Sequence, residues 1–185
     1  MESAKLTFKS AQGSRRILAM ALVLSLALPL TSTISSLPVA FAKPNPSITG
    51  TGTFADTSVT ILSVSFVGSN EVITDAGTGV VAGTMTGTYA FAATITIQPT
   101  GMASYKAIDV CKCTISPAQP GILVFSETGT GNELTGSFQS TAVITLASGG
   151  LRGMTGAATL VGIQNPLTSL TSGTYSLAFF QPKSG

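Results

Sequence analysis

The sequence contains no histidine and no tryptophan, and only 9% of its 185 residues are charged. Without histidine, the chain cannot build a Ser-His-Asp triad, a Cys-His pair or an imidazole metal site, because each needs a group that titrates or binds metal near neutral pH. Nucleic-acid binding requires clustered lysine and arginine, which this chain lacks. We therefore expect no nucleic-acid partner, no metal and no cofactor, and the composition argues against most hydrolase chemistry.

The first 42 residues have the pattern of a secretory signal peptide. Four basic residues precede an uncharged run over residues 17–30, and an Ala-x-Ala site ends at Ala42. We expect cleavage after Ala42 and a protein that is secreted or located at the cell surface or in the periplasm. Two adjacent arginines resemble a twin-arginine signal, so both export routes stay open. Prolines in this segment argue against the alternative of an uncleaved anchor, and we expect no stable membrane span after cleavage.

Removal of the signal peptide reverses the sign of the charge. Residues 43–185 contain five basic and six acidic residues, so the formal charge changes from +2 to −1. Residues 43–47, Lys-Pro-Asn-Pro-Ser, contain two prolines and are expected to form a flexible lead-in. Residues 48–182 are expected to form a single domain.

Apolar and polar residues alternate from residue 48 onward, in segments separated by Gly, Asn, Asp and Pro. This pattern is typical of antiparallel strands with one buried face. In residues 84–97 the threonines fall on one face and the larger apolar residues on the other. Residues 134–146 repeat the pattern, with Leu134 and Leu146 on the apolar face. The other predicted strands are 48–55, 59–67, 71–82, 103–115, 121–130, 156–162 and 172–181.

Four tripeptides combine glycine, a hydroxyl residue and an aromatic ring, beginning at Gly52, Gly87, Gly136 and Gly173. Glycine within a strand permits strong coiling of a sheet, and we expect the ring two positions later to cover it on the same face. Few charges are present to protect strand edges, which favours a closed barrel without exposed edges. We predict an all-β fold, a closed antiparallel barrel of about eight strands.

A family resemblance rests on residues 148–156, Ser-Gly-Gly-Leu-Arg-Gly-Met-Thr-Gly, and on Gly-Thr-Tyr-Ser-Leu at 173–177. These segments resemble the C-terminal signature of allene oxide cyclase and dirigent-like barrels, a glycine-rich turn of the form Gly-Gly-Leu-x-Gly-x-x-Gly. Residues 125–129 and 134–138 resemble a bacterial branch of that superfamily without established activity. The resemblance covers roughly residues 121–180 and implies an eight-stranded antiparallel barrel with a central apolar cavity.

Glu127 and Asp109 are weak candidates for catalytic residues, because they interrupt otherwise uncharged strands. Inside an apolar barrel, desolvation would raise the pKa of either carboxyl and allow it to act as a general acid or base. Glu127 alternates in phase with Leu123 and Phe125, so it faces inward if they do. The alternative is that both carboxylates face outward and are solvated.

Four aromatic residues, Tyr89, Phe91, Phe138 and Tyr175, are candidates for the wall of a ligand cavity. Rings in such positions more often fill a core. The interior of an eight-stranded barrel is either packed by side chains or holds one small ligand, and the sequence leaves both open.

Cys111 and Cys113 would project from the same face of one strand. Export favours oxidation, and we expect a strained local disulfide or a bridge between molecules. A local bond would be strained because residues two apart in a strand lie near or beyond the usual Cα separation. Two inert thiols and a soft-metal or redox site are the alternatives, and no third cysteine or histidine is present to complete a metal site.

Three functions fit these observations. The one we favour is a secreted, non-catalytic barrel that binds a small apolar ligand or acts as an accessory protein. The second is an isomerase or cyclase of the allene oxide cyclase kind, which steers a reactive substrate by the shape of its cavity. The third is a structural surface or filament subunit, in which residues 43–53 pair with a neighbouring sheet and the chain forms a homo-oligomer.

Overall fold

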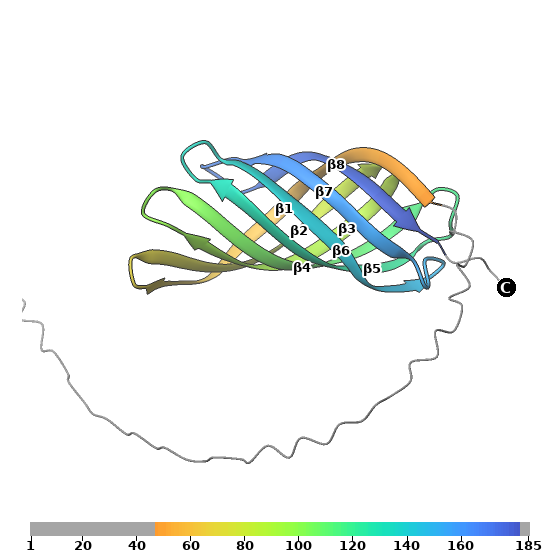
Figure 1. The fold of residues 1–185 in the computed structure, drawn as a ribbon, viewed down its shortest axis with the longest axis horizontal. Coiled ribbons are helices and arrows are strands. Elements are labelled where there is room, and N and C mark those ends of the chain that lie inside the picture. Colours follow the sequence, from red (N-terminus) through yellow and green to blue (C-terminus); the bar gives the residue numbers. More distant parts are fainter. Residues whose placement is uncertain (1–46, 182–185) are drawn as a thin grey trace, which may run out of the picture. The chain divides into compact units, whose positions relative to one another are not determined.

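The computed structural model describes residues 47–181 and contains eight strands and no helix in that part of the chain. Each strand pairs antiparallel with the next, and β8 pairs with β1 to close a barrel (Figure 1). The prediction of a closed antiparallel barrel is thus confirmed. The predicted signal peptide and residues 43–46 of the lead-in lie outside the described residues. The strands are β1 (Ser47–Val67), β2 (Asn70–Gly83), β3 (Met85–Ile97), β4 (Met102–Ile115), β5 (Gly121–Asn132), β6 (Ser137–Gly149), β7 (Thr155–Gln164) and β8 (Thr171–Phe180).

Two predicted strands, 48–55 and 59–67, are one long strand in the structure. Strand β1 continues through the polar segment between them, with register shifts at Asp56/Ser58 and Ile61/Ser63. A β-bulge interrupts the alternation of a strand and bends the strand without ending it. In the sequence this interruption looks like a turn between two strands.

The boundaries predicted for β6 are shifted. Leu134 lies in the turn before the strand and is 81% exposed, and Leu146 is also exposed. In the β5–β6 pair, a register shift leaves Thr145 without a partner. The side chains alternate inward up to Ile144, and after the shift Leu146 points outward. The prediction that both leucines face the core is therefore wrong. Leu134 precedes the strand, and the bulge reverses the alternation between Ile144 and Leu146.

Aromatic rings on the inner wall cover glycines of the neighbouring strand. We expected each ring to cover the glycine two positions earlier in its own strand. That expectation is wrong, because the space in front of each glycine is occupied by atoms of the neighbouring strand. A Cβ built on any of these glycines would lie within 3 Å of the partner ring. The directly opposed pairs are Phe54–Gly173, Tyr175–Gly52, Tyr89–Gly79, Phe91–Gly77, Tyr105–Gly129 and Phe138–Gly162.

The barrel has a closed end and an open end. At the closed end, Ile115, Leu123 and Phe179 are fully buried, and the β6–β7 turn contributes Leu151 and Met154 to the same core. The open end carries the β1–β2, β3–β4, β5–β6 and β7–β8 connections (Figure 1). Packing is therefore concentrated at one end of the barrel.

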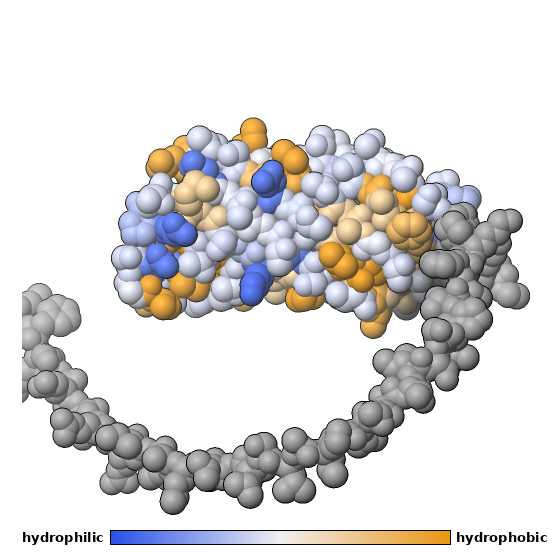
Figure 2. All heavy atoms as spheres, viewed as in Figure 1, coloured by the Kyte–Doolittle hydropathy of each residue, from blue (hydrophilic) through white to orange (hydrophobic). Residues whose placement is uncertain are grey.

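The β1–β2 hairpin extends beyond the rest of the barrel wall. Strand β1 pairs with β8 only over residues 47–55, whereas it pairs with β2 as far as Val67. Phe66 is 72% exposed near the tip of this hairpin. Elsewhere, the visible surface is mostly of intermediate hydropathy with few strongly hydrophilic residues (Figure 2). None of the described residues forms a helix that is long and apolar enough to cross a membrane.

Candidate ligand-binding cavity

A cavity of about 180 Å³ occupies the open half of the barrel. All eight strands contribute to its wall. Its mouth is formed by residues of the β5–β6 and β7–β8 connections and the adjoining strand ends, including Asn132, Gly136, Gln164 and Ser169. The barrel interior is thus packed at one end and hollow at the other, which answers the question that the sequence left open.

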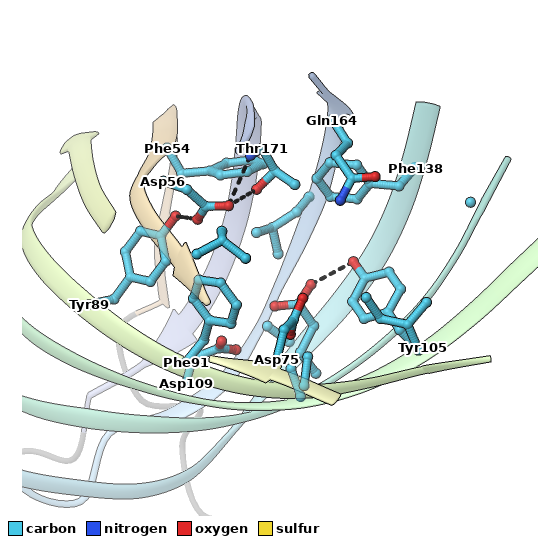
Figure 3. Close-up of a pocket in the computed structure, with 18 of the residues that line it drawn as sticks. Phe54, Asp56, Asp75, Tyr89, Phe91, Tyr105, Asp109, Phe138, Gln164 and Thr171 are labelled. Atoms are coloured by element: carbon cyan, nitrogen blue, oxygen red, sulfur yellow. Dashed lines mark hydrogen bonds between the residues drawn. The ribbon is translucent and has the colours of Figure 1, made fainter. Parts of the chain in front are cut away.

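Four carboxylates from four strands line this cavity: Asp56 from β1, Asp75 from β2, Asp109 from β4 and Glu127 from β5. Figure 3 labels the three aspartates. The structure therefore brings the two predicted candidates, Asp109 and Glu127, into the same site. Glu127 is buried in phase with Leu123 and Phe125, as the alternation predicted.

Asp56 is held at the mouth by hydrogen bonds from two strands. The hydroxyl of Tyr89 donates to Asp56 Oδ1 at 2.6 Å. The backbone N–H of Thr171 donates to Oδ2 at 2.9 Å, and the Thr171 hydroxyl donates to the same atom at 2.5 Å. These bonds fix the carboxylate in the gap where β1 leaves β8. Burial, followed by the hydrogen bond to Asp56, raises the pKa of Tyr89, so its hydroxyl stays protonated and remains a donor.

Glu127 is held in a similar way by an aromatic donor. The Tyr105 hydroxyl donates to Glu127 Oε1 at 2.8 Å. Burial and the charge of Glu127 raise the pKa of Tyr105. Two of the four carboxylates are therefore oriented by tyrosines that cannot readily lose their protons.

Asp75 and Asp109 have no such partners. Asp75 is 7% exposed, and its Oδ1 is buried without a hydrogen-bond partner among the described residues. The same holds for Oδ2 of Asp109. Burial, and then the charge of Asp56, raises the pKa of Asp75 to about 6. Burial, and then the charge of Glu127, raises the pKa of Asp109 to about 8.

All four predicted cavity rings line the cavity: Tyr89, Phe91, Phe138 and Tyr175. Phe138 packs edge-on against Tyr105 and Phe54, with ring centroids 6.2 and 6.0 Å apart. Aromatic side chains therefore face the carboxylates across the same space (Figure 3).

Tyr175 touches the cavity but has a structural role. Its hydroxyl accepts the N–H of Met85 at 2.8 Å and donates to the carbonyls of Met85 (2.9 Å) and Ala82 (3.2 Å). The side chain is 3% exposed. Its polar atom ties β8 to the β2–β3 turn and is not available to a ligand.

Cys111 and Cys113 are free thiols, both buried on the inner face of β4. The structure thus differs from the expected oxidised pair. At 2% and 4% exposure, neither sulfur is accessible for a bridge between folded molecules. A hydrogen bond with Cys113, together with burial, raises the pKa of Cys111, which keeps this thiol unreactive.

Sequence reasoning missed Asp56 and Asp75. Asp56 was assigned to a gap between strands, because the bulge that keeps it within β1 leaves no mark in the alternation. The sequence does contain a signal for Asp75. This residue shares one face of the strand with Gly77 and Gly79, and those glycines pair with the aromatic residues Phe91 and Tyr89. A charged residue in the glycine-lined phase of a strand could have identified it.

The described residues contain no group of three or more histidine, cysteine or acidic side chains placed to hold a metal ion. The four carboxylates lie on β1, β2, β4 and β5. No known protein-family model matches this chain, and no curated protein sequence matches it.

Proposed function

We propose that this protein is an exported barrel that binds one small, largely apolar molecule in its open half without transforming it. The observation that carries the proposal is the cavity of about 180 Å³, which is open at one end and sealed at the other by a packed core. For comparison, an engineered apolar cavity of about 150 Å³ admits benzene. The site is large enough for a molecule built on a single ring.

The similarity to allene oxide cyclase and dirigent-like barrels belongs to this proposal. The closed eight-stranded barrel and its cavity are features that the similarity implies, and they support it. Export is supported by the N-terminal sequence pattern. N-terminal sequencing of the exported protein is expected to begin at Lys43.

Filling the cavity tests the proposed binding site. Ala107 lies on the cavity wall, opposite Ala93 and Glu127 in the sheet. We expect Ala107→Leu to abolish binding of benzyl alcohol, followed by NMR titration, because the added side chain occupies the space of the ligand. The exposed residue Ala92 provides the matched control, since Ala92→Leu places the same side chain on the outer face.

Native mass spectrometry of the protein purified from its source gives the second measurement. A retained small molecule that is lost in Ala107→Leu and kept in Ala92→Leu supports the proposal. Equal binding of benzyl alcohol to both variants, or none to the unmodified protein, contradicts it.

A second candidate is an isomerase or cyclase. It is favoured by the raised pKa values of Asp75 and Asp109, which place one carboxyl on each side of neutral pH inside an apolar site. In such an enzyme, Asp109 would donate a proton and Asp75 would accept one. Conversion of the molecule found by mass spectrometry into an isomer, lost in Asp109→Asn, would favour this candidate over simple binding.

The structural-subunit alternative expected residues 43–53 to pair with a neighbouring sheet, but residues 47–53 pair with β8 of the same barrel. The alternative is instead favoured by the free edge of β1 beyond residue 55 and the exposed apolar residues on that hairpin. Strand edges of this kind can pair with another chain. A concentration-dependent series of oligomers in the same native mass spectra would favour this alternative.

A further inference from the structure

We propose that the ligand of this cavity is an amine in its ammonium form, with N–H groups directed at Asp75 and an apolar body of about one ring. This inference rests on the proposed binding function and specifies its ligand class.

The first argument is the distribution of charge. Four carboxylates line the cavity and Glu133 lies at its mouth, whereas no lysine or arginine lines it. The cations of the described chain, Lys106, Lys112 and Arg152, are all exposed on the outside. An anionic ligand would find no lysine or arginine to pair with in this cavity. A cationic ligand would meet opposite charges in a site of low dielectric, where their attraction is strongest.

The second argument is the unpartnered oxygen of Asp75. The side chain is more than nine-tenths buried and faces the cavity (Figure 3), yet its Oδ1 accepts no hydrogen bond from the described residues. A buried carboxylate without a donor is costly, and donors are what the cavity wall fails to supply to it. An ammonium group offers up to three N–H donors and a compensating charge, so it satisfies both needs at once.

The third argument is the arrangement of the aromatic rings. Tyr89 and Phe91 line the cavity beside the carboxylates, with ring centroids 6.3 Å apart. Aromatic faces attract cations through their quadrupole, most strongly where water is excluded. Rings and carboxylates together make a site that recognises positive charge on an apolar molecule.

The fourth argument is the asymmetry of the wall. Strands β6 and β7 carry no carboxylate into the cavity and contribute Phe138, Ala142, Ala158 and Leu160. The acidic residues come from β1, β2, β4 and β5. A ligand with a charged end and an apolar end therefore has one orientation in which both ends are matched.

The test compares three molecules of similar size: benzylamine, benzyl alcohol and benzoate. We expect benzylamine to bind at pH 7.5 at least about tenfold more tightly than benzyl alcohol, since a hydrogen bond to a charged group contributes more than one to a neutral group. Benzoate should not bind measurably. Isothermal titration calorimetry and NMR titration measure all three.

Variants at two acidic positions separate the roles of site and overall charge. Asp75→Asn keeps the shape of the side chain and should weaken benzylamine by about tenfold, while benzyl alcohol changes less than about twofold. Glu71 lies on the same strand but outside the cavity, so Glu71→Gln removes one charge from the chain and should leave benzylamine unchanged.

The outcomes distinguish this inference from the function on which it rests. Equal affinity for benzylamine and benzyl alcohol, or an equal loss of benzylamine in both variants, overturns the ammonium ligand while leaving the binding cavity intact. Failure of all three molecules to bind at millimolar concentration overturns the binding function itself, and the inference with it.

Discussion

Asp75 shows at the scale of one residue how a binding site lowers the stability of its own fold. Its carboxyl is buried and is exposed to the charge of Asp56, and both effects favour the protonated form. Its pKa rises from 3.8 to about 6, so the ionised form is disfavoured in the folded chain. A residue that only supported the fold would be expected to have a donor nearby. The absence of one among the described residues fits a group that receives its donor from a ligand.

The pKa values predict how the stability of the ligand-free protein depends on pH. An acid with a higher pKa in the folded chain than in the unfolded chain takes up a proton on folding between those two values. The free energy of unfolding should therefore fall as pH rises from about 4 to 6 through Asp75, and on to about 8 through Asp109. Urea denaturation at pH 5 and pH 8 measures this difference.

Urea denaturation of the variant Asp75→Asn at the same two pH values tests the contribution of Asp75. The amide cannot ionise, so the variant should be more stable than the unmodified protein at pH 8 and should lose less stability between pH 5 and pH 8. Constant stability of the unmodified protein across this range would show that these carboxyls titrate normally. A more stable variant that binds benzylamine less well would demonstrate a trade-off between stability and binding.

Pairs of aromatic rings and glycines are the organising feature at the scale of strands. Each glycine leaves the space into which a ring from the neighbouring strand leans, which places the ring on the inner wall beside the cavity. Tyr105 lies over Gly129 in this way, and its hydroxyl then reaches Glu127 one strand away. The glycines therefore position the tyrosines as well as curving the sheet.

Replacing one such glycine tests this role. A Cβ at Gly129 would lie 2.5 Å from Tyr105 Cε1 and 2.6 Å from the carbonyl oxygen of Gln139. We expect Gly129→Ala to lower the free energy of unfolding by about 1–3 kcal/mol, because ring and backbone must both shift. Chemical denaturation measures this loss.

The control lies two residues further along the same strand. At Gly131 the nearest atoms to a Cβ are Ser137 O at 3.1 Å and Phe138 Cβ at 3.3 Å, and no ring atom is among the nearest contacts. Gly131→Ala should therefore cost less than about 1 kcal/mol, as a modest local change. Equal losses at both glycines would mean that strand flexibility, rather than the ring, requires glycine at position 129.

At the scale of the whole molecule, one end of the barrel interior is packed and the other end contains the cavity. The closed end contains Cys113 and the fully buried Ile115, Leu123 and Phe179, whereas the open end contains the carboxylates. Cys111 lies between them, because it belongs to the core and also lines the cavity. The rigid core can thus hold the strands in place while the open half remains hollow. The β1–β2 hairpin lies outside this division, since its apolar residues are exposed and contribute little packing.

The reactivity of the two thiols measures how often the barrel interior becomes accessible to solvent. Cys111 and Cys113 are buried free thiols, so in the folded protein they should react with a thiol reagent only as fast as the barrel unfolds. Two thiols should be counted in the denatured, unreduced protein. Finding none would support the oxidised pair that the sequence suggested. Rapid reaction of the native protein would show that the thiols are reached through the cavity or by local opening of the closed end.

The sequence by itself determined the strand content, the antiparallel order and the inward phase of most strands, because alternation with a period of two is a local property of the chain. It indicated Asp109 and Glu127 by the same reasoning. Only the tertiary structure decided that β1 passes through Asp56 and that a bulge turns Leu146 outward, because bulges depend on the partner strand. Closure of the barrel also decided that four carboxylates line one cavity. It brings together residues as far apart in the sequence as Asp56 and Glu127.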